Sequence, residues 1–195
     1  MSDLLKTAET ELAALCPPTA AIPLGPMTPV VEGGFTGMNK SDWVVCGSRE
    51  RIGAVLRGAK PARLVDPHGG ARPYKVAPVS EAPGTRALHA VGLALGSGAP
   101  VLCILGSASA ASGAFAEALN TAALSGARVV FLLATTPIED DAPVGRQLAG
   151  NPIDLAKAHG LSAVSVAAKT KDIKAAVAKA RKGEGPALVH VQLEL

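Results

Sequence analysis

Two kinds of apolar pattern alternate along the second half of the chain. Residues 101–105 and 129–133 are uninterrupted apolar runs, as expected of strands that are buried on both faces. Between them, after the small-residue turn SASAASG, residues 115–123 carry apolar side chains at helical spacing. A strand, a helix and a second strand joined by short connections predict a parallel βαβ unit.

The same patterns continue to the C-terminus. Residues 151–159 predict a helix that Gly160 ends, and the next predicted elements are a strand at 161–166, a helix at 171–182 and a strand at 188–193. Alternating strands and helices are typical of an α/β fold. We therefore expect a doubly wound, mostly parallel sheet in a three-layer α/β/α arrangement.

The last predicted strand has one polar face. His190 and Gln192 alternate with Val189 and Val191, whereas a central parallel strand is apolar on both faces. The pattern predicts an edge strand, or one that a partner covers. It also favours a surface position for His190 over a catalytic role.

The first 41 residues have a different character. Residues 1–16 predict a short amphipathic helix, and residues 17–41 are so dense in Pro and Gly that we expect an extended arm or linker. Such a segment either wraps a partner or acts as a flexible tether. The predicted organisation is a helix and Pro/Gly-rich arm at 1–41, followed by one α/β domain at 42–195.

Composition narrows the class of protein. The 195 residues suffice for one well-buried domain, and a hydrophobic share of 48% with only 3% aromatic residues indicates a core of Ala, Val and Leu. A net charge of +3 with so few aromatic residues argues against nucleic-acid binding. No apolar run reaches membrane-spanning length, and the three cysteines show no metal-ligand spacing. A reducing, cytoplasmic setting fits best.

The turn after residue 105 is a candidate ligand-binding loop, because it lies at the carboxyl edge of the predicted sheet. Gly106 and Gly113 would permit close approach of a phosphate. The turn has neither G-x-G-x-x-G nor G-x-x-x-x-G-K-[ST], so the pattern alone favours packing over phosphate binding.

A nucleophilic serine is an alternative use of the same turn. Ser107, Ser109 and Ser112 lie in it, with His159 and His190 downstream. The sequence LGSAS lacks the closing glycine of a G-x-S-x-G elbow, so a hydrolase is disfavoured.

Residues 106–136, GSASAASGAFAEALNTAALSGARVVFLLATT, resemble the diphosphate-binding motif of thiamine diphosphate enzymes. The likeness is greatest to the alpha subunit of the 2-oxoacid dehydrogenase first component, whose motif is roughly G-D-G-A, a Gly, F-x-E-A-x-N-x-A-A-L and, after a strand, E-N-N. It extends more loosely over residues 40–195 and implies the thiamine diphosphate-binding fold. The residues that match the motif without a gap are Gly106, Gly113, Glu117, Ala118, Asn120, Ala122, Ala123 and Leu124.

This chain departs from that motif at the positions of the metal ligands. In the family, the Asp of G-D-G and the second Asn of E-N-N bind the divalent ion that bridges the diphosphate; here Ser107 and Thr136 hold those places. Neutral hydroxyls are weak ligands for magnesium. We therefore expect a vestigial cofactor motif, with no metal ligand and no catalytic residue, at Gly106, Ser107, Ala108, Gly113 and Thr136.

Two other features bear on the active site that the resemblance implies. The family's loop after E-N-N carries a substrate-binding His, whereas PIEDDAPVGRQLAGNP has none, and His68 in PHGGARPYKV is best interpreted as a surface residue. Glu139, Asp140 and Asp141 could replace the metal ligands, although a solvated loop is favoured.

Two hypotheses about function follow. The first is a degenerate alpha-subunit-like domain with a structural, assembly or regulatory role and no cofactor, present as a homodimer or with a beta-subunit-like partner. The second is an active 2-oxoacid dehydrogenase component that binds thiamine diphosphate and magnesium through substituted ligands and works with a beta subunit.

Overall fold

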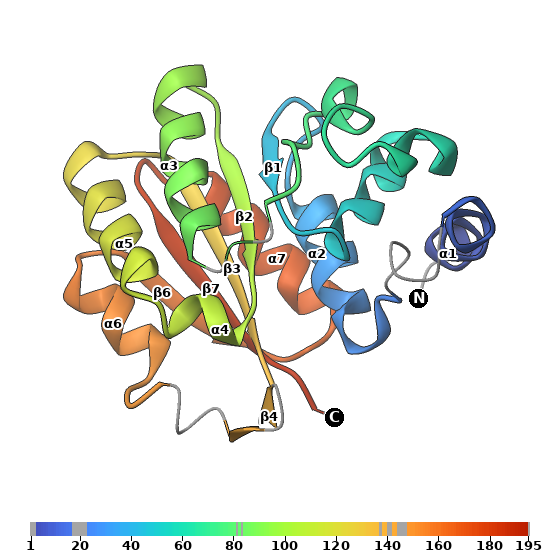
Figure 1. The fold of residues 1–195 in the computed structure, drawn as a ribbon. Helices are drawn as coiled ribbons and strands as arrows, with labels where there is room; N and C mark the ends of the chain where they lie inside the picture. Colours follow the sequence, from blue (N-terminus) through green and yellow to red (C-terminus); the bar gives the residue numbers. More distant parts are fainter. Residues whose placement is uncertain are drawn as a thin grey trace.

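The computed structural model describes residues 3–16, 23–80, 82, 84–136, 138–139, 142–143 and 148–194. Its centre is a five-stranded sheet in the order β1-β2-β3-β7-β6, with every neighbouring pair parallel (Figure 1). The predicted doubly wound parallel sheet is confirmed. The strands are β1 (Trp43–Val45), β2 (Val101–Leu105), β3 (Val129–Thr135), β6 (Ser162–Val166) and β7 (Ala187–Gln192).

Helices cover both faces of this sheet, which makes three layers (Figure 1). One face packs against α3 (Thr85–Ser97), α5 (Gly113–Ser125) and α6 (Pro152–Ala158). The other packs against α2 (Thr28–Gly37) and α7 (Thr170–Arg181). The remaining elements are α1 (Asp3–Leu15), α4 (Ser107–Ala110), the 3-10 helices at Gly25–Met27, Glu50–Arg57, Pro61–Val65 and Arg72–Tyr74, and the short hairpin of β4 (Ile138–Glu139) and β5 (Ala142–Pro143).

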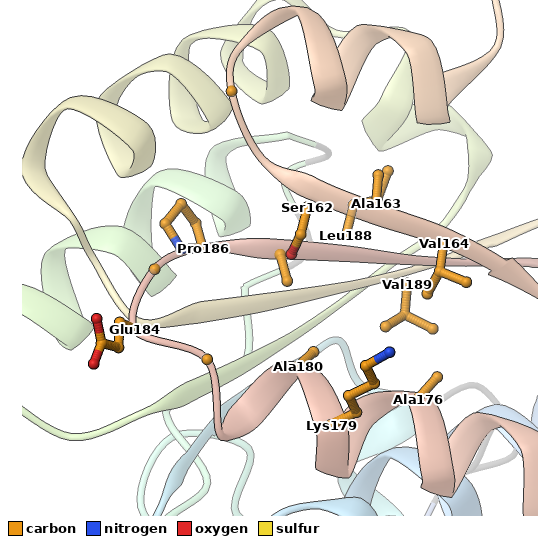
Figure 2. A pocket seen from close by; sticks show the side chains of 14 residues that line it. Ser162, Ala163, Val164, Ala176, Lys179, Ala180, Glu184, Pro186, Leu188 and Val189 are labelled. Carbon is orange, nitrogen blue, oxygen red and sulfur yellow. The ribbon is translucent and has the colours of Figure 1, made fainter.

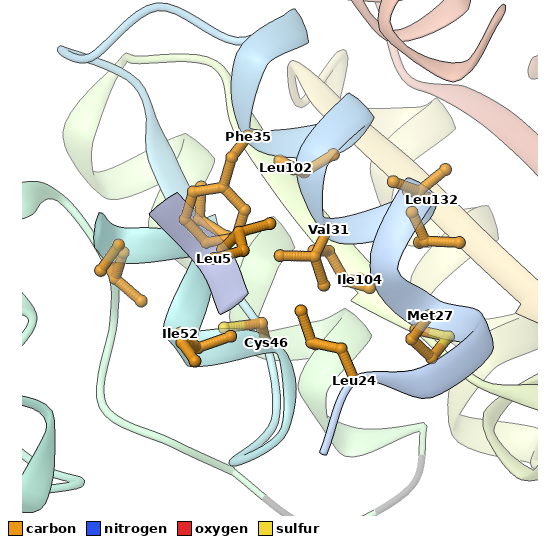
Figure 3. Packing of buried hydrophobic residues seen from close by; sticks show 14 of the residues in the cluster. Leu5, Leu24, Met27, Val31, Phe35, Cys46, Ile52, Leu102, Ile104 and Leu132 are labelled. Carbon is orange, nitrogen blue, oxygen red and sulfur yellow. The ribbon is translucent and has the colours of Figure 1, made fainter. Parts of the chain in front are cut away.

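The central strands supply both hydrophobic layers. Every residue of β2 and β3 is buried, as their continuous apolar sequences predict. Leu102 and Ile104 pack with α2 and the N-terminal helices (Figure 3), whereas Cys103 and Leu105 pack with α3 and α5. Burial raises the pKa of Cys103 to about 12, so its thiol is an inert part of the core.

Helix α2 occupies residues for which the sequence predicts an extended arm, and that prediction is wrong for them. Two of its glycines permit close helix packing. A methyl group on Gly33 would lie 2.8 Å from Ile173 of α7, and one on Gly37 would lie 2.8 Å from Val177. Phe35 is buried in the same core. The glycines that suggest a linker therefore serve contact between two helices.

Strand β7 is not the edge strand that its alternating pattern predicts. It lies between β3 and β6, and the exposed outer strand is β6. His190 of β7 is only 9% exposed, so the prediction of a surface histidine is also wrong. No helix in the described part of the chain is long and apolar enough to cross a bilayer.

Candidate functional site

The candidate site lies at the carboxyl edge of the sheet, where open α/β sheets bind their ligands. Helix α4 begins at Ser107, two residues after β2 ends, and Thr136 directly follows β3. Because β2 and β3 are adjacent and parallel, both connections start at the same edge. In Figure 1 this is the lower end of the sheet, where α4 and the C-terminus lie.

The structure brings Ser107 and Thr136 together. The Thr136 backbone N–H donates to the Ser107 Oγ across 3.2 Å. Ser107 is only 3% exposed, and Thr136 is half-buried. The two positions that hold metal ligands in the family motif are thus adjacent here, but they are joined by an internal hydrogen bond and neither offers a carboxylate.

The rest of the turn is organised by Ser112. Its Oγ accepts from the Phe115 backbone N–H at 3.2 Å and donates to the Ser109 carbonyl at 2.8 Å, so it caps α5. Gly113, the first residue of α5, is exposed, and a methyl group there would meet no described atom within 4 Å. Its small size is therefore not required by packing within the described chain.

Gly106 and Ala108 complete the predicted motif positions. Gly106 is the N-cap of α4 in extended conformation, and Ala108 is half-buried within that helix. At four residues, α4 is too short for its N-terminus to be considered an anion site. All five predicted positions nevertheless lie along two connections at one edge of the sheet.

His190 belongs to a polar cluster that the sequence did not reveal. Its Nε2 lies 2.8 Å from Thr135 Oγ1, and its Nδ1 lies 3.4 Å from Ser165 Oγ. Burial lowers the pKa of His190, so the neutral ring donates from one nitrogen and accepts at the other. Three neighbouring strands, β3, β7 and β6, contribute one residue each.

This cluster weighs against the hydrolase alternative. Among the described residues, the ring of His190 hydrogen-bonds to Thr135 and Ser165 and not to a serine of the turn after β2. The hydroxyl of Ser112 is used to cap α5. A serine nucleophile needs a histidine within hydrogen-bond reach, and the described hydrogen bonds give none to Ser107, Ser109 or Ser112.

A buried ion pair joins the ends of β1 and β2. Arg86 Nη1 lies 3.7 Å from Glu50 Oε2 and donates to the Ile104 carbonyl at 3.1 Å. Glu50 Oε2 also accepts from the Gly47 backbone N–H at 2.8 Å. Glu50 begins the 3-10 helix that follows β1, whereas its partner Arg86 lies in α3, so only the fold reveals the pair.

The residues available to a metal ion do not fit magnesium. Among the described residues, no group of three or more His, Cys, Asp or Glu side chains could hold an ion. The side chains of Glu139, Asp140 and Asp141 lie outside the described part of the chain, so their proposed role as replacement ligands stays a hypothesis. His68 is exposed in its loop, as expected of a surface residue.

Comparison with known sequences gives two curated relatives. Each is a 3-methyl-2-oxobutanoate dehydrogenase subunit alpha from Mycobacterium tuberculosis, one from strain CDC 1551 / Oshkosh and one from strain ATCC 25618 / H37Rv. Each is 30% identical over 177 residues, which are 81% of this chain and 48% of the relative. The chain therefore spans about half the length of the curated relatives it matches. No family model matches it.

Solved structures show the same fold. A proposed thiamin diphosphate-dependent enzyme from Mycobacterium smegmatis has a TM-score of 0.62 and 22% identity, over 85% of this chain and 31% of that chain. Transketolase from Campylobacter jejuni has a TM-score of 0.64 and 15% identity, over 86% and 32%. At these identities the structural likeness shows the fold alone. The chain therefore has the fold of thiamine diphosphate-dependent enzymes, and over 81% of its length its sequence is similar to that of a 2-oxoacid dehydrogenase alpha subunit.

Proposed function

We propose that this chain is a degenerate alpha-subunit-like domain with impaired cofactor binding and a structural, assembly or regulatory role. The observation that carries the proposal is the hydrogen bond between Thr136 N–H and Ser107 Oγ. In the family motif these two positions bind the metal ion; in this chain the Ser107 hydroxyl accepts from the Thr136 backbone instead.

The chemistry of the ion supports this proposal. Magnesium binds hard oxygen ligands, and carboxylates supply the charge that offsets the loss of its water. A buried serine hydroxyl that accepts from a backbone N–H is neutral, so it supplies none of the charge that a carboxylate would bring to the ion. Bound thiamine diphosphate would supply a thiazolium carbanion, but the described residues offer no cluster of carboxylates for the ion of its diphosphate.

Exposed apolar side chains support an assembly role. Leu124 near the end of α5 is 82% exposed, and Leu95 near the end of α3 is 51% exposed. The two helices contact one another and end at the same edge of the sheet (Figure 1). A partner that covers these leucines, either a second copy or a beta-subunit-like protein, would remove them from water.

Three free, buried cysteines are consistent with a reducing, cytoplasmic setting.

The alternative function is an active 2-oxoacid dehydrogenase component, and one observation favours it. Arg51 is only 4% exposed, and its Nε has no hydrogen-bond partner among the described atoms. It lies in the 3-10 helix Glu50–Arg57 that follows β1. A buried cation without a full set of acceptors is costly, and an anionic ligand would relieve that cost. This alternative requires metal ligands from Asp140, Asp141 or a partner subunit.

Calorimetry distinguishes these two functions. Thiamine diphosphate is titrated into the purified protein with and without magnesium. The degenerate function predicts no magnesium-dependent binding at micromolar protein concentration. Tight, magnesium-dependent binding by the unmodified chain would overturn it and support the active component.

The assembly role is tested separately by mass measurement in solution. A dimer, or a complex with a co-purified beta-subunit-like protein, is expected to dissociate in the variant Leu124→Glu. The matched control is Ser125→Glu, because Ser125 is exposed at the end of the same helix. A protein that is monomeric at all accessible concentrations and binds no such partner would contradict this role.

A further inference from the structure

The sheet has two edges that differ in protection. At the β1 edge, Val44 pairs with Val76, the Ala77 N–H donates to the Val44 carbonyl, and the Val44 N–H donates to the Lys75 carbonyl, both at 2.8 Å. At the opposite edge, β6 pairs with β7 on one side and with no described strand on the other. The outer backbone groups of β6 are therefore available for pairing within the described structure.

The sequence of β6 lacks the usual protection of an edge strand. Charged side chains and prolines commonly prevent such strands from pairing with other chains. Ser162–Val166 contains neither. Val164 is 45% exposed, and Ser162 and Ser165 are also exposed. An uncharged edge strand without proline is the kind that accepts an additional strand.

A groove of about 600 Å³ lies beside this strand (Figure 2). Val164 and Val189 face Ala176 and Ala180 of α7, and the turn that includes Glu184 and Pro186 closes one end. The groove is at the amino ends of β6 and β7, so it is separate from the carboxyl edge that holds Ser107 and Thr136. Its size and apolar lining suit one or two side chains of a bound segment.

The charges around the groove favour an acidic occupant. Lys179 lines the groove with its amino group toward the gap between α7 and the sheet (Figure 2). Lys182, directly before the turn that closes the groove, is also exposed, whereas Glu184 is the acidic residue that lines the groove. A second copy paired through β6 would bring the same lysines toward one another, which like-charge repulsion disfavours.

We propose that β6 and this groove dock an extended, acidic segment of a partner protein. The segment adds to the sheet beside β6, its backbone pairs with the outer edge of that strand, one apolar side chain enters the groove, and a carboxylate pairs with Lys179. This function of the surface is independent of whether the carboxyl edge binds a cofactor.

The test uses two fluorescently labelled, acetylated peptides, EVTVTVE and KVTVTVK, and the full chain. Fluorescence anisotropy is expected to show binding of the acidic peptide and at least about tenfold weaker binding of the basic one. Lys179→Glu should reverse this preference. The matched control Lys174→Glu, on α7 but outside the groove lining, should change the affinity for the acidic peptide by less than about twofold.

A second variant and a second measurement test the strand pairing. Val164→Lys places a charge on the edge strand and should abolish binding, while its urea midpoint shows that the fold is retained. Hydrogen exchange at the amides of β6 should slow when the acidic peptide binds. Failure of both peptides to bind, equal affinity for both, or equal effects of the Lys179 and Lys174 variants would overturn the proposal. Self-association that Val164→Lys removes would also overturn it, in favour of a second copy.

Discussion

Helix α5 and the turn before it are adjacent in the chain but differ in how far they depart from the family motif. In α5, the matching residues Ala118 and Ala122 are buried together with Phe115 and Leu119. In the turn, Ser107 replaces a carboxylate, and its hydroxyl accepts from a backbone N–H. Packing depends on side-chain size and spacing, whereas metal binding depends on charge. A chain can therefore lose the second property and keep the first.

The largest expected effect of a substitution is in the packed helix. Phe115 is fully buried and contacts Phe131 edge to face, with ring centroids 6.0 Å apart. Phe115→Ala should lower the free energy of unfolding by about 3–5 kcal/mol, as measured by urea denaturation. The control Leu124→Ala, on the exposed side of the same helix, should stay within about 0.5 kcal/mol. Similar losses in both variants would show that α5 is not packed as described.

A smaller loss is expected in the polar cluster of His190. Thr135→Val removes the hydroxyl that lies 2.8 Å from His190 Nε2 and leaves a buried ring nitrogen without that partner. The free energy of unfolding should fall by about 1–3 kcal/mol. The conservative variant Thr135→Ser restores a hydroxyl and should recover most of it. No difference between the Val and Ser variants would contradict the hydrogen bond.

The same cluster predicts a pH dependence of stability. Burial holds the pKa of His190 below its ordinary value of 6.5, so the unfolded chain binds the proton more tightly than the folded chain. The stabilisation by the neutral ring is complete above about pH 6.5 and is lost as the pH falls toward the lowered pKa, with a slope of at most about 1.4 kcal/mol per pH unit. His190→Gln should remove this contribution, as measured by urea denaturation between pH 5 and 8. An unchanged pH profile in the variant would refute the assignment.

The smallest expected effect is at the candidate site itself. Ser107→Ala deletes the acceptor for the Thr136 N–H and should cost about 0.5–1.5 kcal/mol. Ser125→Ala, at an exposed position in α5, is the control and should cost less. A loss as large as that of Phe115→Ala would mean that Ser107 has a structural role beyond this hydrogen bond.

The sequence predicted best those elements whose local pattern of apolar residues matches their burial in the folded chain. β2 and β3 are continuous apolar runs and are fully buried. The strand at Ser162–Val166 and the helix at Thr170–Arg181 differ from their predicted bounds by one residue at one or both ends. The family resemblance, and not the local pattern, assigned Ser107 and Thr136 to one site; in the structure they follow two neighbouring parallel strands.

The failures involve residues whose meaning depends on a distant partner. Gly33 and Gly37 suggest a linker until α7 packs against them. His190 alternates with valines in the sequence, and this pattern suggests an exposed strand face. Its hydroxyl partners, Thr135 and Ser165, are 55 and 25 residues away in the chain, so the pattern does not show them. Local periodicity cannot reveal that three neighbouring strands each place a polar side chain at one point.

The central claim is that the turn after β2 has lost metal-dependent cofactor binding while the scaffold remains. Its most direct test is the calorimetric titration of thiamine diphosphate and magnesium into the double variant Ser107→Asp, Thr136→Asn beside the unmodified chain, with urea midpoints to confirm that both are folded. Restoring the family's two ligands should produce magnesium-dependent binding that the unmodified chain lacks. Equal, magnesium-dependent binding by the two proteins would contradict the claim.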